Sequence, residues 1–348
     1  MNVALPHAAA GSDPSPRLVA DIGGSNARFG WLEPGACRPA HVATLAVAQH
    51  TGLVATMAAY LEGVRATLGA NYRPPHSAAL AVATAVSGDI VDFTNSAWSF
   101  SQRTLRNAFA LDTLVVLNDF EALALALPHL TPSQLRAHGD VPSGRGTLAV
   151  IGPGTGLGVA GVLATAQGQA IAIPGEGGHA TLAAANHFEA ELLAIVRRSF
   201  EHVSAERLLS GIGLPVLHAA VRESMSGMAG AAQSMLEAQQ IIADGLSGDA
   251  VCRRTLDVFC ALLGSFAGNV ALTLGARGGV YIGGGIVPRL GDVFFSSDFR
   301  ARFEGKGRLR PYLQAIPTAL ITDTLVALTG AAAALDQLRP TPASAQTA

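Results

Sequence analysis

The feature that most constrains the fold is a change of pattern in residues 114–127, LVVLNDFEALALAL. Leu114–Leu117 is a short apolar run typical of a buried strand, and the pattern becomes helical from Phe120. Asn118 and Asp119 stand at this junction, where the strands of open α/β sheets present side chains to ligands. An unpaired charge is costly at a buried strand end, so we expect Asp119 to have a partner there. The alternative is that Asp119 only caps the helix.

Strands and helices alternate along the chain, which predicts layered α/β domains. Its 348 residues are enough for two domains with full cores. Residues 1–16 and 339–348 are expected to be disordered tails, and the first of them lacks the pattern of a signal peptide. The apolar stretch Val258–Leu274 predicts a buried core helix rather than a membrane span. Other helices are expected at 51–68, 102–108, 187–200, from near Ser204, 233–244 and 325–338.

Charge and cysteine content exclude several classes of protein. The formal net charge of -2 provides no electrostatic footprint for nucleic acid or an anionic membrane surface. Cys37, Cys252 and Cys260 form no Cys-x-x-Cys pair, so neither a disulfide framework nor a zinc site is expected. A reducing compartment fits this cysteine usage.

A single lysine limits how the chain can bind a nucleotide. Lys306 is followed by Gly307, whereas a Walker A loop needs Ser or Thr at that position. The strand lysine of protein kinases has no counterpart either. A nucleotide would therefore have to be held by backbone N–H groups and a metal ion.

Two stretches repeat the order of apolar strand, glycine turn and apolar strand. They comprise Leu18–Ile22, Gly23–Asn26 and Ala27–Leu32, and then Thr147–Ile151, Gly152–Gly158 and Val159–Leu163. The glycines suit the positive φ that a tight hairpin needs, and the repetition indicates a weak internal duplication. Successive N–H groups of such a turn can bind an anion, and Asp21 can hold a Mg²⁺ carried by phosphates. An ordinary hairpin is the alternative for the first turn.

A third glycine cluster, Gly283, Gly284 and Gly285, follows an expected strand. A flat or phosphorylated ligand lying against bare backbone would explain all three glycine segments together. Residues 156–161 also fit Gly-x-Gly-x-x-Gly, with Glu176 further on, which imitates a dinucleotide-binding fingerprint. We disfavour that interpretation because Val159–Leu163 has the pattern of a strand rather than a helix.

Four further polar residues are candidates for binding hydroxyl groups. Glu176 and His179 flank two glycines and could hold a polyol, although a structural histidine is the alternative. Glu206 stands near the expected start of a helix, where an acid favours the helix dipole. Asn95 is either a turn residue or a hydroxyl ligand.

Seven segments in their order along the chain resemble the bacterial glucokinase family of the hexokinase/actin-like ATPase fold. They are LVADIGGSNAR, FTNSAWSFS, LNDFEALALALP, GPGTGLGVAGVL, IPGEGGHATL, AERLLSGIGL and IGGGIVPRL, within residues 17–336. Two departures are Ser25, where the family usually has Thr, and residues 323–326, which lack an Asn-Pro-Gly-Leu turn. The resemblance implies two α/β domains with a cleft between them. We expect residues 17–129 and 320–336 in the smaller domain and 130–319 in the larger.

The resemblance also implies ATP-dependent phosphorylation of glucose at its 6-hydroxyl, with Asp119 as catalytic base. The residues that match sugar ligands are Asn95, Asn118, Glu176, His179 and Glu206. The residues that match the ATP site are Ala20, Asp21, Ile22, Gly23, Gly24, Ser25, Asn26, Gly152, Gly154, Thr155, Gly156, Gly283, Gly284 and Gly285. The implied cofactor beside ATP is Mg²⁺ at Asp21, directly or through water, and the family's enzymes are cytoplasmic homodimers.

Phosphoryl transfer depends mainly on positioning and charge neutralisation, so a base of ordinary pKa should suffice at Asp119. Two other functions stay open from the sequence. One is a kinase for another hexose or with another phosphoryl donor. The other is a non-catalytic sugar sensor on the same fold, although residues 1–16 are too short for a DNA-binding helix-turn-helix.

Overall fold

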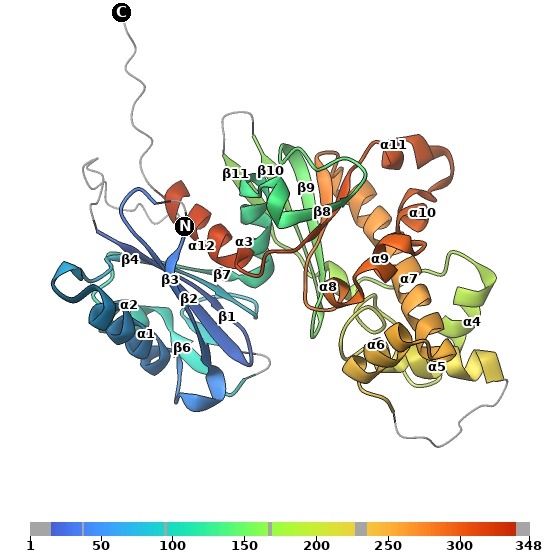
Figure 1. The fold of residues 1–348 in the computed structure, drawn as a ribbon, viewed down its shortest axis with the longest axis horizontal. Coiled ribbons are helices and arrows are strands. Elements are labelled where there is room, and N and C mark those ends of the chain that lie inside the picture. Colours follow the sequence, from blue (N-terminus) through green and yellow to red (C-terminus); the bar gives the residue numbers. More distant parts are fainter. Residues whose placement is uncertain (1–14, 37, 94–95, 166–168, 227–234, 339–348) are drawn as a thin grey trace, which may run out of the picture. The chain divides into compact units, whose positions relative to one another are not determined.

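The computed structural model describes residues 15–36, 38–93, 96–165, 169–226 and 235–338. The chain divides into two compact units, Met1–Ala126 with Leu325–Ala348 and Leu127–Thr324 (Figure 1). Residues 127–129 and 320–324, which we expected in the smaller domain, fall in the second unit. Apart from Ser15 and Pro16, the expected tails lie outside the described residues.

The first unit contains a five-stranded sheet. Its strands are β1 (Arg17–Ile22), β2 (Asn26–Leu32), β3 (Ala40–Ala46), β4 (Ser77–Val82) and β7 (Thr113–Asn118). Its helices are α1 (Leu53–Leu68), α2 (Gln102–Ala108), α3 (Asp119–Ala126) and α12 (Val326–Gln337), and β5 (Ile90–Asp92) and β6 (Ser99–Ser101) form a separate hairpin. The strand order is β3-β2-β1-β4-β7, with β1, β4 and β7 parallel and β2 antiparallel to both of its neighbours.

Both faces of this sheet are covered, as the apolar run of β1 predicts. Leu18, Ala20 and Ile22 belong to the core that includes α1, whereas Val19 packs with residues of α12. Because side chains alternate along a strand, Asp21 shares the face of Val19. This is the face on which α3 and α12 pack closely, since a Cβ at Gly330 would lie 1.7 Å from the Ala122 carbonyl oxygen.

The second unit contains a six-stranded sheet and most of the helices. Its strands are β8 (Leu135–His138), β9 (Gly146–Pro153), β10 (Leu157–Ala164), β11 (Ala170–Ile173), β12 (Gly279–Ile282) and β13 (Thr318–Ile321). Its helices are α4 (His187–Val196), α5 (Leu214–Ser226), α6 (Ala238–Ser247), α7 (Ala250–Leu274), α8 (Val287–Leu290), α9 (Asp292–Ser296), α10 (Phe299–Glu304) and α11 (Arg310–Gln314). The strand order is β11-β10-β9-β12-β13-β8.

The two sheets repeat one topology. Each begins with a three-stranded antiparallel meander whose first strand pairs in parallel with a later strand, β4 or β12, and that strand pairs in parallel with a further one, β7 or β13. The repetition predicted from the glycine turns is therefore present in the strand order. Because Leu157–Ala164 is a strand of this meander and not a helix, the dinucleotide-binding interpretation of residues 156–161 is wrong.

Helix α7 is the central helix of the second unit. It is long and apolar enough to cross a membrane, but 83% of its most apolar window is buried inside the protein. It begins at Asp249, whose carboxylate accepts hydrogen bonds from the N–H groups of Val251 and Cys252. Gly264 and Gly268 let α10 approach closely, since a Cβ at either position would lie within 2.5 Å of its backbone. The predicted core helix is thus confirmed.

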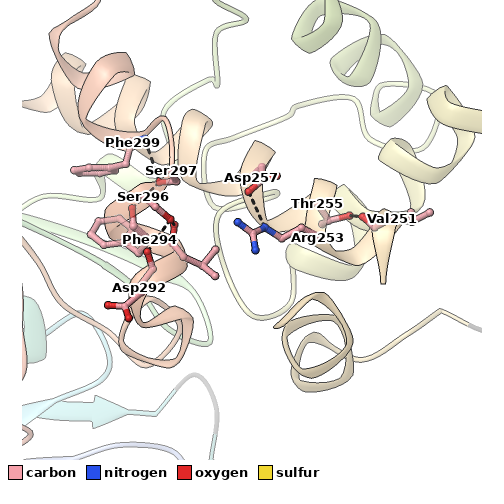
Figure 2. A network of polar contacts seen from close by, with 10 residues as sticks. Val251, Arg253, Thr255, Asp257, Asp292, Phe294, Ser296, Ser297 and Phe299 are labelled. Atoms are coloured by element: carbon pink, nitrogen blue, oxygen red, sulfur yellow. Dashed lines mark hydrogen bonds and ion pairs between the residues drawn. The ribbon is translucent and has the colours of Figure 1, made fainter. Parts of the chain in front are cut away.

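Serine side chains organise the connection between α9 and α10 beside this core. Figure 2 shows Ser297, whose hydroxyl donates to the Phe294 carbonyl at 2.7 Å and accepts from the Phe299 N–H at 3.2 Å. Ser296 bonds back to the Asp292 carbonyl at 2.9 Å. These contacts end one short helix and start the next, which places Phe294 and Phe299 in the core.

Several expected elements differ from the structure. The helix expected near Ser204 is wrong, because residues 204–213 form turns and α5 begins only at Leu214. The Glu206 N–H bonds the Gly178 carbonyl at 2.8 Å instead of continuing a helix. Helix α4 ends at Val196, earlier than expected, and α6 begins at Ala238. The short strands β3, β8 and β11 were not predicted.

Candidate active site

Polar side chains of the first unit gather at one edge of its sheet. The parallel strands end level with one another, since Ile22 pairs with Val82 and Val82 with Asn118. Asp21 and Asp119 therefore lie at the same edge, two strands apart, or about 10 Å by the usual strand spacing. They also lie on the face where α3 starts.

Asp119 is a half-buried carboxyl group with perturbed acidity. Burial and the nearby negative charge of Asp21 raise its pKa to about 6, and the hydrogen bond from the Phe120 N–H opposes the shift only partly. The reaction was expected to need only a base of ordinary pKa, and Asp119 is more basic than that. A carboxyl group with such a pKa is a better proton acceptor and is still mostly ionised at neutral pH.

Asn118 holds the junction between strand and helix. Its amide nitrogen donates to the Thr84 carbonyl at 3.2 Å, and its amide oxygen accepts from the Phe120 N–H at 2.9 Å. The Asp119 carboxylate accepts from the same N–H at 3.0 Å. Asn118 thus shares the helix-capping contact, which leaves the second oxygen of Asp119 for other partners.

Asp21 faces a cation across the first hairpin. Arg28, its partner in the register of β1 and β2, brings a guanidinium nitrogen to 3.5 Å from the carboxylate. Burial still raises the pKa of Asp21, and the charge of Arg28 lowers it by less. In the adjoining turn the Gly23 N–H bonds the Asn26 carbonyl at 2.9 Å. Gly23 does not adopt a left-handed φ, so our expectation that the hairpin needs one there is wrong.

The donor set at this edge fits a Mg²⁺ bound mainly by phosphates. No group of three metal-ligating side chains occurs within the described ranges of the chain. Two carboxyl groups with raised pKa values nevertheless stand at this edge, where a cation would stabilise their charged forms. Mg²⁺ commonly uses one or two carboxylates together with phosphates and water, and Asp21 could supply such a ligand.

The second glycine turn lies in the other unit and is braced from several sides. It is short, with β9 ending at Pro153 and β10 beginning at Leu157. The Gly154 N–H bonds the Gly156 carbonyl at 2.9 Å, and the Gly211 N–H bonds the Gly154 carbonyl at 2.7 Å. The Ile286 N–H bonds the Pro153 carbonyl at 3.1 Å, so the segment after β12 also rests against this turn.

The third glycine cluster packs closely against the end of β9. Gly284 has a φ of +76°, and a Cβ there would lie 2.3 Å from the Pro153 carbonyl oxygen. The Gly283 N–H bonds the Ile151 carbonyl at 2.8 Å. A Cβ at Gly285 would meet nothing within 4 Å in the described structure. Gly285 therefore leaves bare backbone available to a ligand.

Glu206 and His179 meet beside the second turn. The Glu206 carboxylate accepts from the Leu157 N–H at 2.8 Å and lies 3.9 Å from His179 Nε2. Gly178 permits this approach, since a Cβ there would lie 2.0 Å from the Leu157 carbonyl oxygen. Glu206 lies in a turn and not at the start of a helix, so its interpretation as a helix-dipole residue is wrong.

A cavity of about 350 Å³ adjoins this pair. Its lining includes His179, Glu206, Arg207 and His202, and the Arg207 guanidinium stacks on a phenylalanine ring. Glu176 is exposed and is joined to β10 by a backbone bridge, but it does not line this cavity. Asn95 lies outside the described residues.

The sequence-predicted residues thus form two groups, one in each unit. Asn118, Asp119 and the first turn lie together, and His179, Glu206 and the other two glycine segments lie together. Arg28 and Arg207 were missed. Pairing across the hairpin could have identified Arg28 as the partner of Asp21, whereas no local pattern marks Arg207.

Comparisons with known proteins identify the family of this chain. The glucokinase family model matches residues 18–338. The glucokinase of Aromatoleum aromaticum is 50% identical over 93% of this chain and 96% of its own length, and that of Chromobacterium violaceum is 49% identical over 93% and 91%. A crystal structure of glucokinase from an Antarctic psychrotroph is 37% identical, with a TM-score of 0.82 over 93% of this chain and 99% of that one.

This likeness confirms the fold class predicted from the sequence, the two-domain α/β fold of hexokinase and actin-like ATPases. It extends over nearly the whole chain and includes both glycine hairpins. The chain belongs to the glucokinase family.

Proposed function

We propose that this protein transfers the γ-phosphoryl group of ATP to the 6-hydroxyl of glucose, with Asp119 as general base. The observation that carries the proposal is Asp119 itself, a half-buried carboxyl group with a pKa of about 6 at the edge that also bears the first glycine turn. Family membership supplies the reaction class. The proposal requires both groups of residues to act on the same sugar and nucleotide.

Asp119 would accept the proton of the attacking hydroxyl as the O–P bond forms. Its raised pKa favours that transfer, and its fixed position after β7 limits the geometries from which it can act. The Phe120 N–H and the Asn118 amide hold the junction, so the carboxylate needs little reorganisation during the reaction.

The phosphates of ATP would lie against the N–H groups of the two glycine turns. Two observations support this interpretation. The chain has no Walker lysine. The backbone at Gly154 is accessible, since a Cβ there would meet nothing within 4 Å in the described structure. Mg²⁺, when bound, would neutralise charge developing on the transferred phosphoryl group. Asp21 would hold it, directly or through water, while Arg28 orients the Asp21 carboxylate.

The sugar hydroxyls would be bound by Asn118 from one unit and by Glu176, His179 and Glu206 from the other. The support from geometry is the contact of His179 with Glu206 beside the 350 Å³ cavity. Asn95 is proposed from the resemblance alone. We also infer a cytoplasmic homodimer from the resemblance, and the small net charge gives no reason to add a nucleic acid partner.

A panel of parallel assays tests this function. Purified protein is given glucose, mannose or fructose, each with ATP, ADP or polyphosphate and Mg²⁺, and sugar phosphate is quantified. The expected result is the highest kcat/KM with glucose and ATP. Preference for another sugar or donor would identify a different hexose kinase. Glucose binding without any phosphoryl transfer would favour a sugar sensor and contradict the proposal.

A further inference from the structure

The Glu206 carboxylate of the second unit contacts both the second glycine turn and a proposed sugar ligand, His179. One oxygen of Glu206, Oε2, accepts the Leu157 N–H at 2.8 Å, at the end of the second glycine turn. The other, Oε1, lies 3.9 Å from His179 Nε2. Its side chain is 23% exposed, so it is largely shielded while still able to contact a ligand. The proposed sugar ligand is thus also a structural part of the proposed phosphate loop.

The turn is shaped to admit this carboxylate. A Cβ at Gly156 would lie 2.5 Å from Glu206 Oε2, closer than such atoms can approach. Two positions earlier, a Cβ at Gly154 would meet no described atom within 4 Å. Since Gly156 has no left-handed φ, the missing side chain there serves the contact with Glu206 rather than the backbone conformation.

The backbone around Glu206 is also held by hydrogen bonds to both segments. The Glu206 N–H donates to the Gly178 carbonyl at 2.8 Å, next to His179. Five residues on, the Gly211 N–H donates to the Gly154 carbonyl at 2.7 Å. The sugar segment and the nucleotide turn are therefore tied together at both ends of residues 206–211.

We propose that Glu206 is a positioning residue for the nucleotide turn and that, through it, glucose binding and nucleotide binding are coupled. The inference rests on the proposed function and goes beyond the sugar contact assigned there. A sugar that orders Glu206 also orders the Leu157 N–H and the turn before it. Coupling between two sites is reciprocal, so a change in the turn that displaces the Glu206 carboxylate must also change sugar affinity.

Two variants of Glu206 separate positioning from sugar binding. Glu206→Gln keeps an oxygen that can accept the Leu157 N–H, whereas Glu206→Ala leaves that N–H without its partner. Binding of Mg-ADP is measured by calorimetry in the absence of sugar. We expect Glu206→Ala to bind Mg-ADP about tenfold more weakly than wild type, as the loss of one such hydrogen bond implies, and Glu206→Gln to stay within about twofold.

Two variants of the turn test the reverse direction. Gly156→Ala and Gly154→Ala make the same chemical change, but only the first displaces the Glu206 carboxylate. Glucose binding is measured without nucleotide, beside a thermal melt of each protein. We expect glucose affinity to fall roughly three- to tenfold in Gly156→Ala. We expect it to stay at the wild-type value in Gly154→Ala, whatever that variant does to Mg-ADP.

The inference is overturned if wild type, Glu206→Gln and Glu206→Ala bind Mg-ADP equally, or if both glycine variants bind glucose equally well. If Glu206→Ala does not fold, the glycine pair decides alone. Failure of the proposed function has a different signature, because wild-type protein would then transfer no phosphoryl group to glucose. Coupling is supported only when the Ala and Gln variants differ and the two glycine variants differ.

Discussion

The two glycine hairpins have the same topology but different surroundings. The turn between β1 and β2 accepts a hydrogen bond from the Val47 N–H at the Ser25 carbonyl, and a Cβ at Gly23 would make an ordinary contact of 3.6 Å with the Asn26 carbonyl oxygen. It lies beside two carboxyl groups and an arginine. The hairpin of β9 and β10 carries no charge of its own. It donates a hydrogen bond to the Glu206 carboxylate and accepts hydrogen bonds from the N–H groups of Gly211 and Ile286.

This difference indicates a division of labour between the two units. The first supplies charge and the proton acceptor, while the second supplies a backbone frame that three other segments hold in place. Changes of charge should therefore harm catalysis most in the first unit. Changes of volume should harm stability most in the second.

A large effect is expected from removing charge beside the first hairpin. Asp21→Asn should lower kcat roughly 10²–10³-fold, the range for losing one electrostatic contact to a transition state. It should also raise the Mg²⁺ concentration needed for half-maximal rate. Asp112→Asn makes the same change at the opposite end of β7, where the side chain is 79% exposed, and should leave both values unchanged. Equal kinetics for the two variants would remove Asp21 from the proposed metal site.

An added methyl group should destabilise the segment packed against the second hairpin more than it destabilises the first hairpin. Gly178→Ala places a Cβ 2.0 Å from the Leu157 carbonyl oxygen, so the free energy of unfolding should fall by about 1–3 kcal/mol. Gly23→Ala meets only the 3.6 Å contact and should change it by less than about 0.5 kcal/mol. Denaturant unfolding measures both. Similar losses in the two variants would contradict the contrast between a braced and an open turn.

The pH dependence of catalysis should follow the first unit. Because Asp119 must be ionised to accept a proton and its pKa is raised to about 6, kcat/KM should fall as pH drops through about 6 and level off above it. A rate profile over this range measures the pKa in the free enzyme. A flat profile down to pH 5 would show that the acting base has an ordinary carboxyl pKa.

The smallest effect is expected at the exposed acid of the second unit. Glu176→Gln should raise the KM for glucose roughly tenfold, as the loss of a charged hydrogen-bond acceptor implies, with little change in kcat. Steady-state kinetics with varied glucose measures this. If only the melting temperature changes, Glu176 has a structural role instead.

Much of this architecture could be predicted from the sequence, because local patterns determine it. The apolar run of β1 and the change at Asn118 and Asp119 placed the ends of β1 and β7 to within one residue. The second glycine turn is shorter than the expected Gly152–Gly158, because β9 extends to Pro153 and β10 begins at Leu157. The turns of residues 204–213 could not be predicted in this way. The bond from the Glu206 N–H to Gly178 there depends on chain that is distant in sequence.

For the candidate site as well, the sequence predicted the residue types but not their environments. The residue types were visible, but the pKa of Asp119 depends on burial and on Asp21, which is brought near only by the parallel sheet. The contact between Glu206 and Leu157 is likewise tertiary. Sequence therefore identifies the candidate groups, and the fold determines their acidity and their partners.

The raised pKa of Asp119 also lowers the stability of the folded protein at neutral pH. Its pKa is raised from 3.8 to about 6 on folding, so the protein loses stability as pH rises through this interval. Removing the charge in Asp119→Asn should therefore stabilise the protein at pH 7 by on the order of 1–3 kcal/mol. A melting temperature at or above that of wild type would also show that the variant is folded.

The most direct test of the account is the turnover of Asp119→Asn at saturating glucose and Mg-ATP, in protein whose glucose affinity has been measured. The account predicts a kcat about 10²–10⁴-fold below wild type, the usual range for a general base, with nearly normal glucose binding. A kcat close to wild type would contradict the assignment of Asp119 as the proton acceptor.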